Sequence, residues 1–188
     1  MEKLFRFLNQ LMPLSPELKA DLNKRIYKRI AMHGELVIPE GKVCTQLYFI
    51  RRGFLRGFHY QKGREITTWF AFENDIATST YSFLAQKIAY ENVEAIEDSI
   101  LYGINYDDLN TIYRLHPEFN YIGRLLTEKY YFDLMEHSLS LQFQNAKESY
   151  LQLITDHPQI LKRASLGHIA SYLGISQETL SRIRSKIV

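Results

Sequence analysis

The last part of the chain carries the side chains with the clearest chemical use. A helix beginning after Ser176 would place a set of polar side chains on one face: Gln177, Glu178, Ser181, Arg182, Ser185 and Lys186. Arginine can donate two hydrogen bonds to guanine, glutamate can accept one from cytosine, and glutamine can pair with adenine. Ser176 and Thr179 can bond phosphate, assisted by the helix dipole. This is the chemistry needed to read base edges in the major groove, so double-stranded DNA is the expected partner.

Two short helices must position that face. Ser165 can cap the first helix and Ser176 the second, while Gly174 supplies a positive-φ stop between them. The expected apolar inner faces are Leu166, Ile169, Ala170 and Leu173, then Leu180, Ile183 and Ile187. The segment predicts a helix-turn-helix; an ordinary helical hairpin with a solvated polar face is the alternative. The expected DNA-binding residues are Ser165, Ser176, Gln177, Glu178, Thr179, Ser181, Arg182 and Lys186.

Positive charge gathers in the same region. Residues 160–188 hold five basic side chains and one acidic one, a net of +4, within a chain of net charge +2. The basic residues are Lys162, Arg163, Arg182, Arg184 and Lys186. Such a local excess is the footprint expected for contact with a phosphate backbone. The basic residues Arg51, Arg52, Arg56, Lys62 and Arg64 upstream are interpreted as a solvated face.

The region upstream has a different pattern. Residues 1 to about 30 show helical spacing, including the row Leu18, Leu22 and Ile26, with Ser15 as a cap. From 34 to about 106, short apolar runs alternate with turns, which predicts an antiparallel sandwich or barrel. The 61–64 segment predicts a hairpin turn with Gly63 at positive φ.

A long helix is predicted after Pro117. Its apolar side chains form two rows, and this apolar surface is larger than packing against a single core usually requires. One row is therefore assigned to a partner chain in a homodimer. Burial of the whole helix within one subunit is the alternative. The residues assigned to the dimer helix are Ile122, Leu125, Leu126, Tyr130, Phe132 and Leu139.

Several motifs resemble those of the Crp/Fnr family of transcription regulators. Residues 176–182, Ser-Gln-Glu-Thr-Leu-Ser-Arg, resemble its DNA-reading helix, and 47–53 and 34–41 resemble the start of its effector barrel. In that family the positions of Gln177, Glu178 and Arg182 contact bases. The resemblance implies an α+β fold with three parts. Residues 1–108 would form a cyclic-nucleotide-binding-like effector barrel, a double-stranded β-helix (jelly roll), together with N-terminal helices. Residues 109–140 would form a dimerisation helix, and 141–188 an all-α helix-turn-helix domain. A sequence-specific regulator is the expected function, with RNA polymerase as a further candidate partner.

The chain departs from the family in two places. The segments 73–76 and 89–93 lack the arginine that holds a cyclic nucleotide's phosphate, and Glu91 would repel an anion, so a response to cyclic AMP is not expected. The wing that usually follows the second helix is expected to be absent or vestigial. A different small-molecule effector would contact Trp69, Asp75, Tyr81, Phe83, Tyr90 and Glu91, unless the aromatic residues simply fill the barrel. The alternative function is a ligand sensor whose degenerate helix-turn-helix contacts a protein.

Other classes find little support. Cys44 is the single cysteine, and the six histidines show no metal-ligand spacing, so no metal or other cofactor is expected. No catalytic dyad or triad is recognisable, which argues against an enzyme. No apolar run is long enough to cross a membrane and no signal peptide is recognisable, so we expect a cytoplasmic protein.

Overall fold

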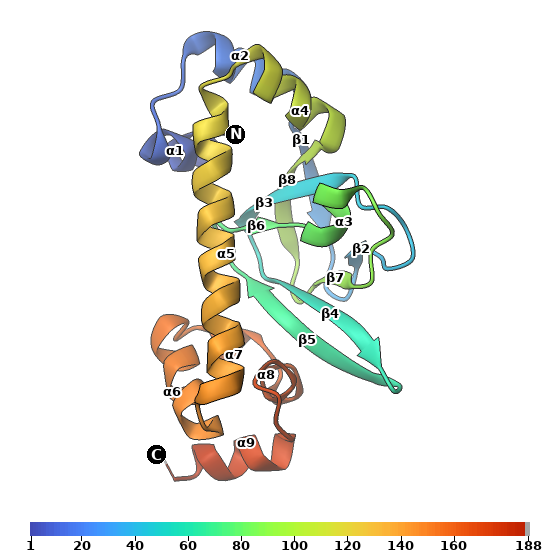
Figure 1. Ribbon diagram of the computed structural model, residues 1–188, viewed down its shortest axis with the longest axis vertical. Coiled ribbons are helices and arrows are strands. Elements are labelled where there is room, and N and C mark those ends of the chain that lie inside the picture. The colour runs from blue at the N-terminus through green and yellow to red at the C-terminus, as the bar shows by residue number, and fades with distance from the viewer. Residues whose placement is uncertain (187–188) are drawn as a thin grey trace.

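The computed structural model describes residues 1–186 and has three parts (Figure 1). The long helix α5 (Phe119–Phe143) runs along the molecule, with a β-barrel beside its middle. Helices α1 (Glu2–Leu11), α2 (Pro16–Arg25) and α4 (Tyr106–Leu115) lie at one end. The opposite end holds α6 (Ala146–Asp156), α7 (Ile160–Arg163), α8 (Leu166–Tyr172) and α9 (Gln177–Arg184).

The barrel consists of two antiparallel four-stranded sheets. The first has the order β1-β8-β3-β6 and the second β2-β7-β4-β5. Their bounds are β1 Tyr27–Ala31, β2 Leu36–Ile38, β3 Gln46–Arg52, β4 Leu55–Gln61, β5 Arg64–Ala71, β6 Ile76–Ala77, β7 Asn92–Ala95 and β8 Ser99–Asn105, with helix α3 Thr80–Ala85 between β6 and β7. The mixed α+β fold with an antiparallel barrel, expected from the sequence, is confirmed.

The β4–β5 hairpin turns as its sequence predicts. Gly63 has φ +76°, and Lys62 before it also has a positive φ of 52°. Two successive positive φ values characterise the turn that suits the twist of a two-residue hairpin. Strand β5 is the last strand of its sheet, so one edge of its backbone has no strand partner among residues 1–186.

Strand β1 replaces the end of a predicted helical row. Helix α2 ends at Arg25, Ile26 is extended, and Tyr27–Ala31 pairs with β8. The i,i+4 spacing of Leu18, Leu22 and Ile26 therefore overstated the helix. Exposed Tyr27 and Ile30 lie on this strand, so burial does not alternate cleanly and the sequence carries no period-two signal.

The region predicted as one dimerisation helix over 109–140 contains a break. Helix α4 ends at Leu115, and α5 starts at Phe119. The assignment of Ile122 to a dimer surface is wrong, because its side chain is wholly buried against α1 and α4 within one chain. Leu126 packs against the same cluster, whereas Tyr130, Phe132 and Leu139 are exposed.

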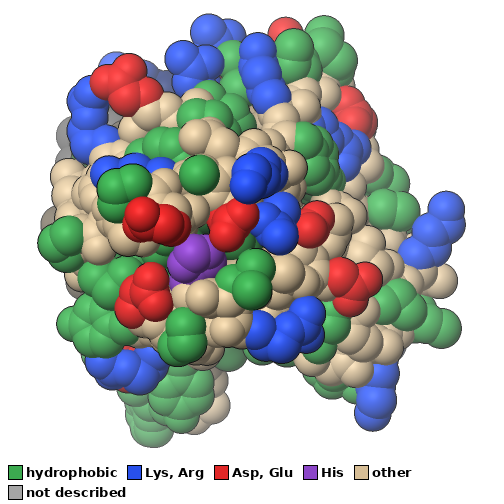
Figure 2. Space-filling model, turned by 90° about the horizontal axis from the view of Figure 1, so that it is seen from above, with side chains coloured by type: hydrophobic (Ala, Val, Ile, Leu, Met, Phe, Trp, Pro, Cys, Tyr) green, Lys and Arg blue, Asp and Glu red, His purple; other side chains and the backbone are tan. Residues whose placement is uncertain are grey.

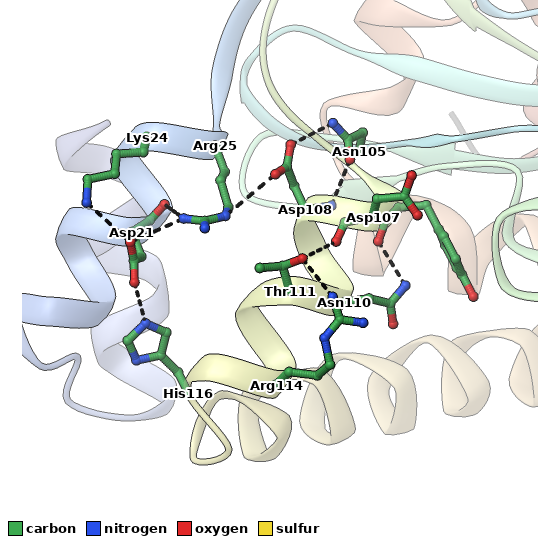
Figure 3. A network of polar contacts seen from close by, with 11 residues as sticks. Asp21, Lys24, Arg25, Asn105, Asp107, Asp108, Asn110, Thr111, Arg114 and His116 are labelled. Atoms are coloured by element: carbon green, nitrogen blue, oxygen red, sulfur yellow. Dashed lines mark hydrogen bonds and ion pairs between the residues drawn. The ribbon is translucent and has the colours of Figure 1, made fainter.

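A polar network closes the end of the molecule that carries α2 and α4. His116 Nε2 lies 2.9 Å from Asp21 Oδ2, and Arg25 Nε lies 3.5 Å from Asp108 (Figure 3). Figure 2 shows acidic and basic side chains interspersed on this face around a histidine. Opposite charges that neutralise each other offer no single-sign surface to a polyanion.

The barrel and the C-terminal helices share one apolar core. Phe54, Phe72 and Ile96 of the barrel pack in the same cluster as residues of the helices, which are Tyr150, Leu153, Ile160, Ile169, Ala170, Leu173 and Leu180. The two parts are therefore joined by more than a linker. Within residues 1–186, no helix is both long and apolar enough to span a membrane.

Candidate nucleic-acid interface

Side-chain caps fix where α8 and α9 begin. Ser165 Oγ accepts a hydrogen bond from the backbone N–H of His168 at 3.1 Å, and Ser176 Oγ accepts one from that of Thr179 at 3.2 Å. Each cap satisfies a backbone donor that a helix start leaves free. Both caps predicted from the sequence are confirmed.

The turn between α8 and α9 depends on Gly174. Its φ of +67° is a left-handed conformation that side chains with a Cβ rarely adopt. The turn is closed by the N–H of Ile175, which donates to the carbonyl of Ala170 at 3.0 Å. Ile169, Ala170 and Leu180 are buried, so the two helices pack through their predicted inner faces. Ile187, also assigned to that face, lies outside the described residues.

The outward face of α9 is polar and open. The side chains of Gln177, Glu178, Ser181, Arg182, Ser185 and Lys186 are all exposed. Thr179 is half-buried, and its hydroxyl oxygen accepts a hydrogen bond from Arg182 Nη2 at 3.3 Å. The Glu178 carboxylate accepts from its own backbone N–H and from Ser176, and these bonds lower its pKa. The face thus presents one anionic side chain, two cationic side chains and neutral hydrogen-bonding groups together.

The positive charge of the C-terminal segment is distributed unevenly. Arg163 lies away from the α9 face, where its guanidinium forms ion pairs with Glu73 and Glu97 of the barrel. The interpretation of Arg163 as part of a phosphate-binding footprint is therefore wrong. Lys162, Arg182 and Lys186 are exposed, and Arg184 is half-buried. Charge counted along a sequence overstates what a ligand can reach.

One basic residue of the barrel is buried, although the sequence pattern predicts that it is exposed. The expectation that Arg56 lies on a solvated face is wrong, because its side chain is only 3% exposed and pairs with Glu65 and Glu94. Arg51, Arg52, Lys62 and Arg64 are exposed, as expected. Buried arginine requires paired carboxylates, and here they come from the two neighbouring strands.

The structure brings together only part of the predicted effector pocket. Trp69 lies over Gly57, where a Cβ would come within 2.2 Å of the indole, and its Nε1 donates to Glu91 Oε2 at 3.0 Å. The buried Ser79 donates to Glu91 Oε1 at 3.0 Å. Burial raises the pKa of Glu91. Trp69 and Glu91 are thus hydrogen-bonded to each other within the barrel. The sequence alone shows neither the role of Ser79 nor the need for Gly57.

The other four residues of that set lie apart. Phe83 is buried in the barrel core and packs edge-on against Tyr106. Asp75 accepts from the N–H of Phe72 at 2.9 Å and faces Lys129 of α5 at 3.8 Å. Tyr81 and Tyr90 form an exposed ring pair 5.6 Å apart. The six residues therefore do not line one common cavity.

A second open surface lies on α5. The helix buries Phe119 and Ile122 near its start but exposes many large apolar side chains along the rest. These are Tyr121, Tyr130, Tyr131, Phe132, Leu134, Met135, Leu139, Leu141 and Phe143, each at least 40% exposed. An apolar surface of this extent on a single helix is typical of an interaction site.

Comparison with known proteins agrees with this architecture. The sequence model of the cyclic nucleotide-binding domain family matches residues 28–116. No curated protein matches the sequence. Among solved structures, the c-di-GMP-responsive global regulator CLP of Xanthomonas campestris is 17% identical with a TM-score of 0.71, covering 92% of this chain and 91% of its own.

Two further structures show the same similarity. FixK2 of Bradyrhizobium japonicum is 19% identical with a TM-score of 0.71, over 86% of this chain and 84% of its own. The catabolite activator protein of Thermus thermophilus is 20% identical with a TM-score of 0.58, over 94% and 85%. Residues 28–116 therefore match a cyclic nucleotide-binding domain, and the overall fold is similar to that of Crp/Fnr-type regulators.

Proposed function

We propose that this chain is a sequence-specific DNA-binding transcription regulator that acts as a homodimer. The observation that carries the proposal is the outward face of α9, a capped helix whose inner side is buried and whose outer side presents only polar groups. A short helix with this composition fits the major groove, where Gln177, Glu178 and Arg182 would meet base edges.

The exposed apolar face of α5 supports the dimer. Two copies of the helix packed side by side would cover rings such as Phe132 and aliphatic groups such as Leu139. A two-fold axis along this contact would present two copies of α9 to successive major grooves. Such a dimer reads half-sites about one helical turn of DNA apart.

The interior of the barrel is unfavourable for binding an anion. Glu91 occupies its interior, accepts from Trp69 and Ser79, and would repel a phosphate. We accordingly expect that cyclic AMP, added at saturating concentration for a typical receptor, leaves DNA affinity unchanged. A measurable shift in the DNA-binding isotherm on addition of cyclic AMP would contradict this part of the proposal.

Fluorescence-anisotropy titration of the dimer against genomic fragments, at two salt concentrations, tests DNA recognition. We expect binding that prefers particular fragments and weakens with salt, because phosphate contacts release counterions. Equal affinity for all fragments, or no binding at either salt concentration, would refute the proposed function.

Sedimentation velocity tests the dimer separately. Phe132→Asp should yield monomers, because it places a charge in the apolar contact. Ile30→Asp is the matched control, since Ile30 is equally exposed, at 60% against 61%, but lies on β1. If Phe132→Asp stays dimeric while remaining folded by circular dichroism, α5 is not the dimer contact.

A further inference from the structure

The C-terminal helices are held to the barrel through Arg163. Its Nη1 lies 2.8 Å from Glu73 Oε2, its Nη2 lies 3.0 Å from Glu73 Oε1, and its Nε lies 3.2 Å from Glu97 Oε2. Glu73 follows β5, and Glu97 lies in the turn between β7 and β8. One guanidinium thus joins α7 to two separate loops of the barrel, with the paired donor geometry that arginine favours for carboxylates.

The surroundings of Arg163 are built to hold it. Its guanidinium lies 5.1 Å from the centre of the Phe54 ring and 5.6 Å from that of Phe72, and its side chain is 18% exposed. Glu73 also accepts from the backbone N–H of Gly53 at 2.9 Å. Burial opposes ionisation of Glu73, but its bonds to Arg163 and Gly53 outweigh burial and hold its pKa at about 2.

A second attachment joins α8 to the free edge of β5. Ser171 Oγ accepts from the backbone N–H of Thr67 at 2.9 Å and donates to the carbonyl of Glu65 at 3.0 Å. The hydroxyl occupies the place that a neighbouring strand would take. Beside it, the Tyr172 ring lies 5.3 Å from Phe70 of β5 and stacks on His137 of α5 at 4.1 Å.

These contacts bear on the orientation of α9. In sequence, α9 is connected to α5 only through α6, α7 and α8, and α7 has four residues. A short linker alone does not fix the angle between the dimer helix and the DNA-facing helix. The contact with the barrel adds a second connection between the C-terminal helices and α5, besides the linker. The barrel can make this connection because it also packs on α5 through the apolar cluster around Ile122.

We propose that Arg163 is a positioning residue: with Glu73 and Glu97 it fixes α9 relative to the barrel and α5, and so sets the spacing of the two recognition helices in the dimer. The proposal rests on the proposed function for its consequence at DNA. Its structural core, that Arg163 holds the C-terminal helices on the barrel, is testable without DNA.

Amide hydrogen exchange of the free protein is the direct test. The N–H of Thr67 reports docking, because its acceptor is Ser171 of α8. Arg163→Ala should accelerate its exchange at least about tenfold, while amides of the β3–β8 ladder keep their protection. Lys162→Ala is the matched control, since Lys162 is the preceding, exposed basic residue of α7, and it should leave Thr67 unchanged.

Two further variants separate positioning from simple stabilisation. Arg163→Lys should restore part of the Thr67 protection, because lysine can pair with one carboxylate but cannot form the paired bonds. Combining Arg163→Glu with Glu73→Arg should recover more protection than Arg163→Glu alone. If Arg163→Ala instead speeds exchange equally at Thr67 and in the β3–β8 ladder, Arg163 only stabilises the whole fold and the proposal fails.

DNA binding supplies the second readout. Arg163→Ala should lower affinity for the preferred fragment and change the preferred half-site spacing, while the dependence of log affinity on log salt keeps its slope. Loss of a phosphate contact would reduce that slope by about 1. Unchanged Thr67 protection together with a reduced slope would show that Arg163 binds phosphate and would overturn the proposal. If the wild type binds no DNA, the exchange experiment still decides the role of Arg163.

Discussion

Arg163 and Arg182 belong to the same basic segment, yet the fold uses them in opposite ways. Arg182 lies on the outward face of α9, where its guanidinium donates to the Thr179 hydroxyl, whereas Arg163 is enclosed by Glu73, Glu97 and two phenylalanine rings. The face around Arg182 is open to a ligand, and the junction around Arg163 is already occupied by the protein. Positive charge near a candidate DNA-binding helix is therefore informative only after its partners are known.

The largest difference between the two faces should appear in stability. Ile160 is fully buried in the shared core of the junction, so Ile160→Ala should lower the free energy of unfolding by about 2–5 kcal/mol. Ser181→Ala on the open face should change it by less than about 0.5 kcal/mol. Urea denaturation followed by circular dichroism gives both values. Equal losses for the two variants would mean that the junction is not part of the folded core.

The open face should dominate affinity. Arg182→Ala should weaken binding to a preferred DNA fragment by about 1–3 kcal/mol and relax base preference, with little loss of stability. Arg6→Ala is the control, because this substitution removes the same charge at a distant place. Arg6 is an exposed arginine on α1, at the end of the molecule opposite α9. Anisotropy titration measures both. An equal effect of the two variants would show that only overall charge matters.

A smaller effect should come from the hydroxyl that joins α8 to β5. Ser171→Ala removes a bond to Thr67 and one to Glu65, and should destabilise the protein by about 0.5–1.5 kcal/mol. Thr67 should then exchange faster, as in Arg163→Ala but to a lesser degree. Ser185→Ala, on the open face, should alter neither quantity. Full Thr67 protection in Ser171→Ala would show that the hydroxyl does not hold this edge.

The smallest expected effect is an acid-dependent one at the junction. The folded pKa of Glu73, about 2, lies below its unfolded value of 4.5, so its ion pair stabilises the fold above pH 4.5 and this contribution is lost as pH falls toward 2. Solvent contact keeps the effect small, because screening weakens a partly exposed pair. Stability measured from pH 5 to 2 should fall more steeply in the wild type than in Glu73→Gln. Parallel curves would contradict the role of this carboxylate.

The predictable parts of the molecule are those with local causes. Ser165, Gly174 and Ser176 define α8, the turn and α9 within a few residues of one another, so their caps and the positive φ follow from side-chain and backbone chemistry alone. The 61–64 hairpin belongs to the same class. By contrast, β1 is a strand because β8 pairs with it, and its own spacing continues the apparent helical row of Leu18 and Leu22.

The candidate site divides in the same way. The polar face of α9 can be predicted from the order of its residues, because a capped helix that buries one side must expose the other side. The fates of Arg163, Arg56 and Ile122 depend on groups far away in the chain, such as Glu73, Glu94 and the helices α1 and α4. The separation of Asp75 from Trp69 and Glu91 likewise depends on where the fold places these three residues in space.

The sequence by itself determined the antiparallel barrel, the long helix and the polar face of α9, because apolar periodicity and caps act over a few residues. Only the tertiary structure decided which arginine is free and which is enclosed, which side of α5 is buried, and how Trp69 and Glu91 satisfy each other. The physical reason is that ion pairs and burial depend on distance in space, and residues 90 positions apart can meet in one contact.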